Sequence, residues 1–264
     1  MKPAYIREEL IRQKKAGLSG NLYYDTQISF AYNSNHMEGS TITLDETASI
    51  FDTGSLFVTD EKTINVAHVT EISNHFRLFN YMLDTYSMVL NEDLIKEYHR
   101  ILKEGTYTYD QLQIYNVGEY KKYTNKVGGF VTVKPEKVAD EMDDLLTWYN
   151  SLQTVHLDQL ALFHARFESI HPFQDGNGRV GRMILFKECL KNDLIPFVIL
   201  DETKAKYYSA LRRYQQFGKV NKLADFFAEQ TEEYERTAGL FLSEMEKPER
   251  IDKRKKTKDR EESR

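Results

Sequence analysis

The sequence has one cysteine, only five prolines and no long apolar run. A single cysteine cannot form an intrachain disulfide, so we expect Cys189 to be a buried structural thiol in a reducing cytoplasm. No uncharged apolar stretch approaches the roughly 18 residues that a membrane-spanning helix needs. Residues 1–17 carry charges throughout, unlike a secretion signal. These absences predict a cytoplasmic protein with no membrane partner.

An excess of positive charge is also lacking. The formal net charge is −5 over 264 residues, so the chain as a whole does not have the basic character of a nucleic-acid-binding protein. The basic residues that stand out lie in 246–264, a segment with almost no apolar residues that we expect to be a disordered, charged tail. The remainder has an apolar content typical of a folded protein, and nucleic acid is not an expected partner.

Because proline is scarce, long helical patterns run uninterrupted. Residues 62–86 place apolar side chains at spacings of three and four, which predicts an amphipathic helix. Thr43 and Glu46 form a capping-box pattern that marks another helix start. The expected helices cover 3–16, 26–38, 43–53, 62–86, 91–104, 136–151, 156–170, 179–191, 201–217 and 221–245.

One segment breaks the helical pattern. Residues 120–135 place β-branched and aromatic residues on both sides of Gly128-Gly129, and Pro135 closes the segment. This arrangement predicts a short β-hairpin. The fold class expected is therefore all-α, with one small hairpin that must pack on the helical body because a lone hairpin is marginal in water.

The segment 171–182, HPFQDGNGRVGR, concentrates the residues that could carry chemistry. Gly176-Asn177-Gly178 allows the backbone to adopt positive φ and approach a ligand closely. Helix signals on both sides make the stretch a loop that enters a helix N-terminus, where unpaired N–H groups and the helix dipole favour an anion. The pattern predicts a phosphate-binding loop.

The side chains of this loop suit phosphate chemistry as well. Asp175 can hold Mg²⁺, which prefers carboxylate, water and phosphate oxygens. Arg179 and Arg182 are three residues apart on one helix face, so both can point toward phosphates. His171 is the side chain in the loop that can act as a neutral base near pH 7.

The segment resembles the signature HxFx(D/E)GNGRxxR of the Fic family (filamentation induced by cAMP), and every fixed position matches. The resemblance implies a Fic fold, a helical bundle around the loop and its helix, and a Mg²⁺-dependent protein adenylyltransferase, which moves AMP from ATP to a Ser, Thr or Tyr hydroxyl of a target protein or of itself. His171 would accept the hydroxyl proton and Asp175 would hold the Mg²⁺. The remaining implied nucleotide contacts are Gly176, Asn177, Gly178, Arg179 and Arg182.

The resemblance extends beyond the motif, to about residues 26–240. The hairpin at 120–135 stands where the family has its target-binding flap, and alignment of the hairpin places Lys126, Val127 and Gly128 nearest the nucleotide. Candidates for the adenine pocket on a later helix are Tyr207, Tyr208 and Gln215. The implied organisation is an N-terminal helical region over 1–90, a Fic core over 91–245 and the tail.

A second segment resembles the family's inhibitory motif (S/T)xxxE(G/N). Ser34 and Glu38 are four apart on one helix face, in an inhibitory helix expected over about 26–39, and Gly39 is placed to end that helix. Glu38 can pair with Arg182 and so remove the arginine that would hold the γ-phosphate. The chain is therefore expected to be autoinhibited.

The sequence leaves other functions open. A phosphodiesterase that removes AMP could use Glu38 to orient a water, with the same surrounding residues. Fic-type transfer of UMP, phosphocholine or phosphate is a third reading, although Gly178-Arg179 argues against the phosphate-transferring relatives. A non-catalytic binding module is a fourth, which the intact motif disfavours. The resemblance also allows a homodimer.

Overall fold

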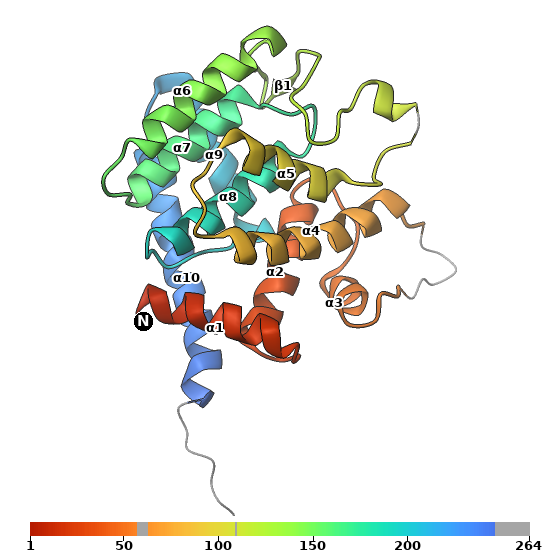
Figure 1. Ribbon diagram of the computed structural model, residues 1–264, viewed down its shortest axis with the longest axis vertical. Helices are drawn as coiled ribbons and strands as arrows, with labels where there is room; N and C mark the ends of the chain where they lie inside the picture. Colours follow the sequence, from red (N-terminus) through yellow and green to blue (C-terminus); the bar gives the residue numbers. More distant parts are fainter. Residues whose placement is uncertain (57–62, 109, 246–264) are drawn as a thin grey trace, which may run out of the picture.

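The computed structural model describes residues 1–56, 63–108 and 110–245. Figure 1 shows a bundle of helices with α8 in its middle. The helices are α1 (Pro3–Ala16), α2 (Leu22–His36), α3 (Leu44–Thr53), α4 (Val66–Thr85), α5 (Glu92–Lys103), α6 (Val138–Asn150), α7 (Leu157–Ile170), α8 (Asn177–Lys191), α9 (Lys204–Phe217) and α10 (Asn221–Met245). Short 3₁₀ turns are η1 (Gln111–Gln113), η2 (Pro135–Lys137) and η3 (Asp201–Thr203). The all-α fold class is confirmed, and the expected tail at 246–264 lies outside the described residues.

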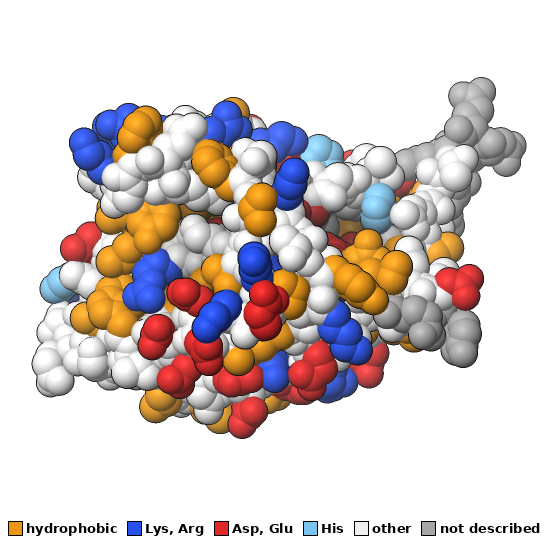
Figure 2. All heavy atoms as spheres, turned by 90° about the horizontal axis from the view of Figure 1, so that it is seen from above, with side chains coloured by type: hydrophobic (Ala, Val, Ile, Leu, Met, Phe, Trp, Pro, Cys, Tyr) orange, Lys and Arg blue, Asp and Glu red, His pale blue; other side chains and the backbone are white. Residues whose placement is uncertain are grey.

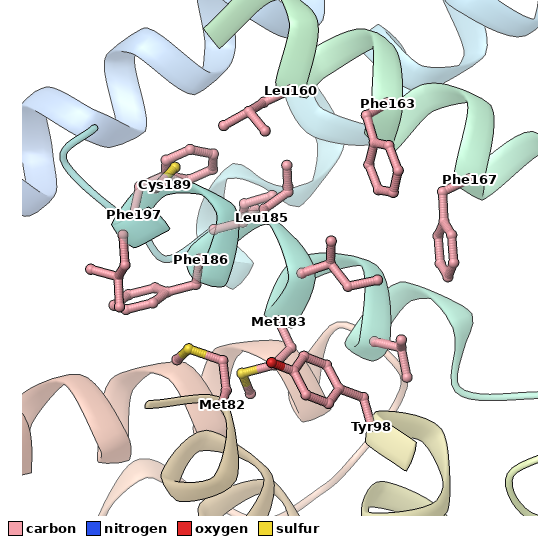
Figure 3. Packing of buried hydrophobic residues seen from close by; sticks show 14 of the residues in the cluster. Met82, Tyr98, Leu160, Phe163, Phe167, Met183, Leu185, Phe186, Cys189 and Phe197 are labelled. Carbon is pink, nitrogen blue, oxygen red and sulfur yellow. The ribbon is translucent and has the colours of Figure 1, made fainter. Parts of the chain in front are cut away.

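The central helix α8 is buried along nearly its whole length. It packs against α1, α2, α4, α5 and α7. Figure 3 shows Met183 and Phe186 of α8 between Phe163 of α7 and Met82 of α4. A helix that is apolar on several faces is stable only when other helices cover it. The loop that precedes α8 is therefore held at a fixed place in the bundle.

The N-terminal helices pack into the same core as the rest of the chain. Ile6 and Leu10 of α1 and Phe30 of α2 are at most 1 % exposed and belong to the cluster that contains Phe186. A smaller apolar cluster joins α2, α3 and α4. Cys189 is buried and free, as expected of a structural thiol.

The hairpin is present but shorter than the segment 120–135 suggests. Its strands are β1 (Lys126–Val127) and β2 (Phe130–Val131), paired antiparallel with Val127 opposite Phe130. The backbone φ is positive at both Gly128 and Gly129, as a tight two-residue hairpin turn requires. One further bond joins the two arms, from the Thr132 N–H to the Asn125 carbonyl over 3.2 Å, and earlier residues bond to the motif loop instead, where the Lys121 N–H donates to the Pro172 carbonyl over 2.8 Å.

The helix boundaries differ from the expected ones mainly where capping decides. Helix α2 begins at Leu22, four residues before the expected start, because the Asn21 side chain accepts a hydrogen bond from the Tyr24 N–H and caps the helix there. Helix α8 begins at Asn177, directly after Gly176. In the described ranges, none of the helices combines the length and apolar character that crossing a membrane requires.

Basic and acidic side chains are mixed on the surface seen from above. Over the lower half of the view in Figure 2, Lys and Arg side chains stand beside Asp and Glu side chains. The surface of the described residues includes ion pairs such as Arg77 with Glu104 and Arg100 with Glu97. Exposed pairs of this kind contribute little stability each.

Candidate functional site

The motif loop connects α7 to α8 through two residues with positive φ. Helix α7 ends at Ile170 and is followed by His171, whose φ of 53° is unusual for a residue other than glycine, and Gly176 precedes α8 with φ of 82°. Asn177 closes the loop: its side chain accepts from the Phe173 N–H and donates to the Phe173 carbonyl, each over 2.8 Å. Phe173 is fully buried and stacks on His99 with ring centroids 3.9 Å apart. The loop conformation is thus set by its own side chains.

His171 lies at the wall of a cavity of about 330 Å³. Burial, with a smaller contribution from the Lys121 ammonium, lowers the pKa of His171 to about 4. The imidazole is therefore neutral near pH 7, which is the state in which it can accept a proton. Its Nδ1 lies 4.0 Å from a carboxylate oxygen of Glu168.

This cavity brings together most of the residues expected around a nucleotide. Val127 and Gly128 come from the hairpin, and Tyr207, Tyr208 and Gln215 come from α9. Lys126 is exposed and is not among the residues that line the cavity. The remaining lining residues are Glu38, Glu168, His171, Gly178, Arg182, Leu211 and Arg212, of which Glu168, Leu211 and Arg212 were not singled out from the sequence.

The predicted ion pair between Glu38 and Arg182 is present. Arg182 is 2 % exposed, and its Nη2 donates to Glu38 Oε1 over 2.8 Å and to the Ser34 carbonyl over 2.9 Å. Its Nε donates to the Ser34 hydroxyl over 3.0 Å. Burial would raise the pKa of Glu38, but Arg182 and Arg179 outweigh it and the pKa is lowered, so the carboxylate stays ionised. These hydrogen bonds from Arg182 all go to α2 and to a residue just after it.

The Glu38 carboxylate lies directly over the start of α8. A Cβ at Gly178 would be 2.4 Å from Glu38 Oε1, so only glycine leaves room for the carboxylate there. The first N–H groups of a helix are a natural anion site. Glu38 thus places its own negative charge where the sequence predicts a phosphate.

A second cavity of about 580 Å³ lies on the other side of Glu38, which lines both cavities. It is highly charged. Arg179 pairs with Glu71 and, through Nη2 at 3.3 Å, with Asp175. Lys103 pairs with Glu71 and donates to Asp175 Oδ2 over 2.7 Å. Neither Lys103 nor Glu71 was expected from the sequence, because each occupies an ordinary helical position on α5 or α4.

Asp175 fits a cation site in which the protein supplies one ligand and water and substrate phosphates supply the others. Burial would raise its pKa, but Arg179 and Lys103 outweigh burial and hold the pKa well below its usual range. The described residues contain no group of three or more His, Cys, Asp or Glu side chains that could hold a metal ion. A hard cation such as Mg²⁺ commonly takes one or two carboxylates, with waters and substrate phosphates as its other ligands. One ionised carboxylate on a cavity wall fits that pattern.

Residues 89–188, which run from just before α5 into α8, match the model of the Fic/DOC family. This segment contains the hairpin and the motif loop. Residues 89–188 are therefore similar to a Fic domain.

The similarity of this chain to other proteins extends beyond residues 89–188. The protein adenylyltransferase fic-1 of Caenorhabditis elegans is 26 % identical over 212 residues, which cover 78 % of this chain and 40 % of that protein. The protein adenylyltransferase Fic of Drosophila melanogaster is 27 % identical over 215 residues, 80 % of this chain and 41 % of that protein. The chain thus spans about two fifths of the length of these relatives.

Solved structures with a similar fold are known. A Fic-domain-containing signaling protein from Bacteroides thetaiotaomicron has a TM-score of 0.72 at 22 % identity and covers 88 % of this chain and 95 % of that one. A fragment of Fic-1 from Caenorhabditis elegans has a TM-score of 0.67 at 22 % identity and covers 90 % of this chain and 70 % of that one. Both similarities include far more than residues 89–188, so helices outside this segment share the arrangement.

Proposed function

We propose that this chain is a protein adenylyltransferase, which transfers AMP from ATP to a hydroxyl side chain of a protein, and that Glu38 holds it inactive. The relatives named protein adenylyltransferase support this proposal. The observation that carries it is the cavity in which a neutral base, His171, faces the start of α8 and the Arg182 guanidinium. A base beside an anion site is what a nucleotidyl transfer needs.

The residues of this cavity divide the work of the reaction. His171 accepts the proton of the attacking hydroxyl, because its imidazole is neutral at the working pH. The N–H groups at the start of α8 and Arg182 stabilise the negative charge that develops on the phosphate. Tyr208 and Leu211 supply an apolar wall suited to the adenine ring of ATP, next to Val127 of the hairpin. Catalysis then rests on position and charge rather than on covalent chemistry by the protein.

Asp175 and Arg179 belong to the phosphate end of the site. Asp175 is the residue that would hold a Mg²⁺ ion, which when bound neutralises phosphate charge. Arg179 is fixed by Glu71 and Asp175, so its guanidinium has a defined position at the second cavity. A guanidinium fixed in this way binds phosphate oxygens without a large loss of side-chain freedom.

Glu38 inhibits by competing with phosphate for the same groups. Its carboxylate takes the Nη2 of Arg182 and lies over Gly178. A phosphate cannot occupy that place while Glu38 is there, because two anions would share one desolvated site. Ser34 reinforces the closed state through its hydroxyl and carbonyl, which bind the same arginine.

The experiment that tests this proposal is intact-mass spectrometry of the purified Glu38→Gly variant with Mg²⁺ and each nucleoside triphosphate in turn. We expect the mass of one AMP to be gained by the protein or by an added target only with ATP, at least tenfold faster than for the wild type. The double variant Glu38→Gly, His171→Ala should gain nothing. If Glu38→Gly gains no mass with any nucleotide, or if the wild type instead strips AMP from a modified protein, the adenylyltransferase proposal is wrong.

The remaining assignments follow from this function. We propose that the partners are ATP and a protein that presents a Ser, Thr or Tyr hydroxyl, which the hairpin would hold as an added strand. The chain itself is one candidate target. A cytoplasmic location and a homodimer also remain proposals.

A further inference from the structure

Three cations and three carboxylates meet around the start of α8. They form two linked groups, because Glu38 approaches Arg182 while the other four make a closed ring of ion pairs. The six are Lys103, Arg179, Arg182, Glu38, Glu71 and Asp175. The formal charges balance only while Glu38 is present. When Glu38 leaves, the cluster keeps an uncompensated positive charge, which favours the entry of an anion.

Lys103 is the member of this cluster that the motif does not supply. It is the last residue of α5 and is 1 % exposed, although its ammonium group lies at the wall of the second cavity. Its Cδ lies 3.4 Å from the place that a Cβ at Gly176 would occupy. The lysine stem therefore runs beneath the glycine of the motif loop and delivers its charge to Asp175.

The Asp175 carboxylate has no acceptor capacity left in this state. Oδ2 accepts from Lys103 over 2.7 Å and from the Tyr107 hydroxyl over 3.1 Å. Oδ1 accepts from the Gly176 N–H over 2.6 Å and from Arg179 over 3.3 Å. A carboxylate has about four lone-pair sites, so a cation can bind Asp175 only after one of these donors moves away.

A buried ammonium that leaves one anion needs another. Glu71 stays beside Lys103 when Asp175 is released, but Arg179 shares that carboxylate, so the buried ammonium loses part of its charge compensation unless another anion replaces Asp175. The second cavity touches the first at Glu38, and its rim includes Val66 and Ala67 at the N-terminus of α4, whose dipole adds a further preference for anions. A polyphosphate that passes Glu38's position reaches both the ammonium and this helix end.

We propose that Lys103 is a further polyphosphate-binding residue, which holds Asp175 in the closed state and moves to phosphate oxygens of a nucleoside triphosphate when Glu38 withdraws. The inference rests on the proposed function, since it requires a nucleoside triphosphate in the first cavity. It adds a third cation to Arg179 and Arg182, from α5 rather than from the motif. Lys103 should therefore matter for the part of the ligand beyond the α-phosphate and not for the nucleoside.

Calorimetric titration of Lys103→Met in the Glu38→Gly background, with EDTA present so that no metal contributes, separates these parts. The probes are ATP, inorganic pyrophosphate and AMP. We expect the affinity for ATP and pyrophosphate to fall about tenfold, as the loss of one charge-assisted contact implies, while AMP binds within about twofold of the Glu38→Gly parent. The matched control is Lys187→Met, which removes another fully buried lysine, paired with Glu188, and should leave all three affinities unchanged.

Two results would overturn the inference: ATP and pyrophosphate binding equal to the parent, or an equal loss for AMP, which would indicate a merely structural lysine. Should Lys103→Met fail to fold, Glu71→Gln tests the same idea with the opposite sign, because it frees Lys103 from a carboxylate. That variant should bind pyrophosphate several-fold more tightly, and weaker binding would contradict us. If the Glu38→Gly parent binds neither ATP nor AMP, both in EDTA and when the titrations are repeated with Mg²⁺, the proposed function itself fails.

Discussion

The Glu168 carboxyl group is buried, and few of its neighbours stabilise a negative charge on it. It is 6 % exposed, and its Oε1 has no hydrogen-bond partner among the described residues. On its own helix it faces His164 at 3.9 Å and His171 at 4.0 Å. Burial raises its pKa to about 8, while Arg182 lowers it and Glu38 raises it further. From the other packed elements, Tyr207 and Tyr208 face it as well, and Lys121 faces the adjacent His171.

The shift at Glu168 makes stability depend on pH in a definite direction. An unfolded glutamate loses its proton near pH 4.5, whereas the folded protein keeps it up to about pH 8. Between these values the folded state binds the additional proton, so the free energy of unfolding falls as the pH rises and stays low above pH 8. Glu168→Gln removes this penalty, and we expect its melting temperature to exceed that of the wild type by roughly 5 °C at pH 9 but by little at pH 5.

Scanning calorimetry at both pH values measures this difference directly. The exposed Glu136→Gln is the matched control, since the same substitution at the surface should leave the melting temperature unchanged at either pH. A melting-temperature difference for Glu168→Gln that is the same at pH 5 and pH 9 would contradict the assignment of this group.

Single residues of the site were predictable from the sequence where they are close in the chain. The motif from His171 to Arg182 could be recognised because its loop and helix start are contiguous. Glu38 could be placed by its spacing from Ser34 and by the resemblance. Lys103 and Glu71 could not, because only the packing of α4 and α5 against α8 brings their side chains to Asp175.

Helix α2, which leads to the inhibitory residue Glu38, ends just before that residue. Helix α2 stops at His36, and the Ser40 N–H then bonds to the Asn35 carbonyl over 3.1 Å. This reversal passes through Gly39, whose φ is 92° and whose Cβ position faces open space. The left-handed conformation, rather than any lack of room, is thus what requires glycine there.

Gly39→Ala should therefore act through backbone strain alone. We expect a loss of roughly 1 kcal/mol in the free energy of unfolding, because alanine tolerates this conformation poorly. If the strain favours release of Glu38 from Arg182, as we expect, self- or target labelling with ATP should rise several-fold, less than in Glu38→Gly. Urea unfolding and a labelling time course measure the two effects.

A matched control for Gly39→Ala is Gly17→Ala. Gly17 also has a left-handed φ, of 63°, with open space around its Cβ position. It follows the last residue of α1 and does not adjoin Glu38. Gly17→Ala should lower the free energy of unfolding by a similar amount and leave the labelling rate unchanged. If both variants raise the rate equally, general loosening rather than release of Glu38 is responsible.

Helix interiors were more predictable than helix ends. The apolar spacing of the segment 62–86 correctly indicated α4, but its described start at Val66 depends on the Asn65 side chain, which accepts from the Ala67 N–H. The hairpin was found by its glycines and β-branched residues. Its length was not, because competing bonds between Lys121 and the motif loop depend on tertiary structure.

On the scale of the whole molecule, helix α2 and the motif loop belong to one packed core. We propose that residues 1–90 act as the regulatory region and 91–245 as the catalytic one, yet buried side chains from both belong to a single cluster. Phe30 of α2 packs against Phe186 of α8, with ring centroids 5.6 Å apart. The inhibitory helix therefore cannot be removed without opening the core behind the motif.

Deletion of residues 1–39 should unfold the protein rather than activate it. The deletion removes Ile6, Leu10, Leu22 and Phe30, each at most 1 % exposed. Burial of four such side chains contributes roughly 6–12 kcal/mol, which is comparable to the whole stability of a typical domain. We expect the truncated chain to be insoluble or to lack a cooperative melting transition by circular dichroism. The Glu38→Gly variant without the deletion should instead keep a cooperative melting transition, because the substitution removes no side chain from the apolar core, although Arg182 loses its carboxylate partner. A soluble, cooperatively folded truncation that labels with ATP would show that the region around α2 is a separable inhibitor, and that the shared core contributes far less than its burial indicates.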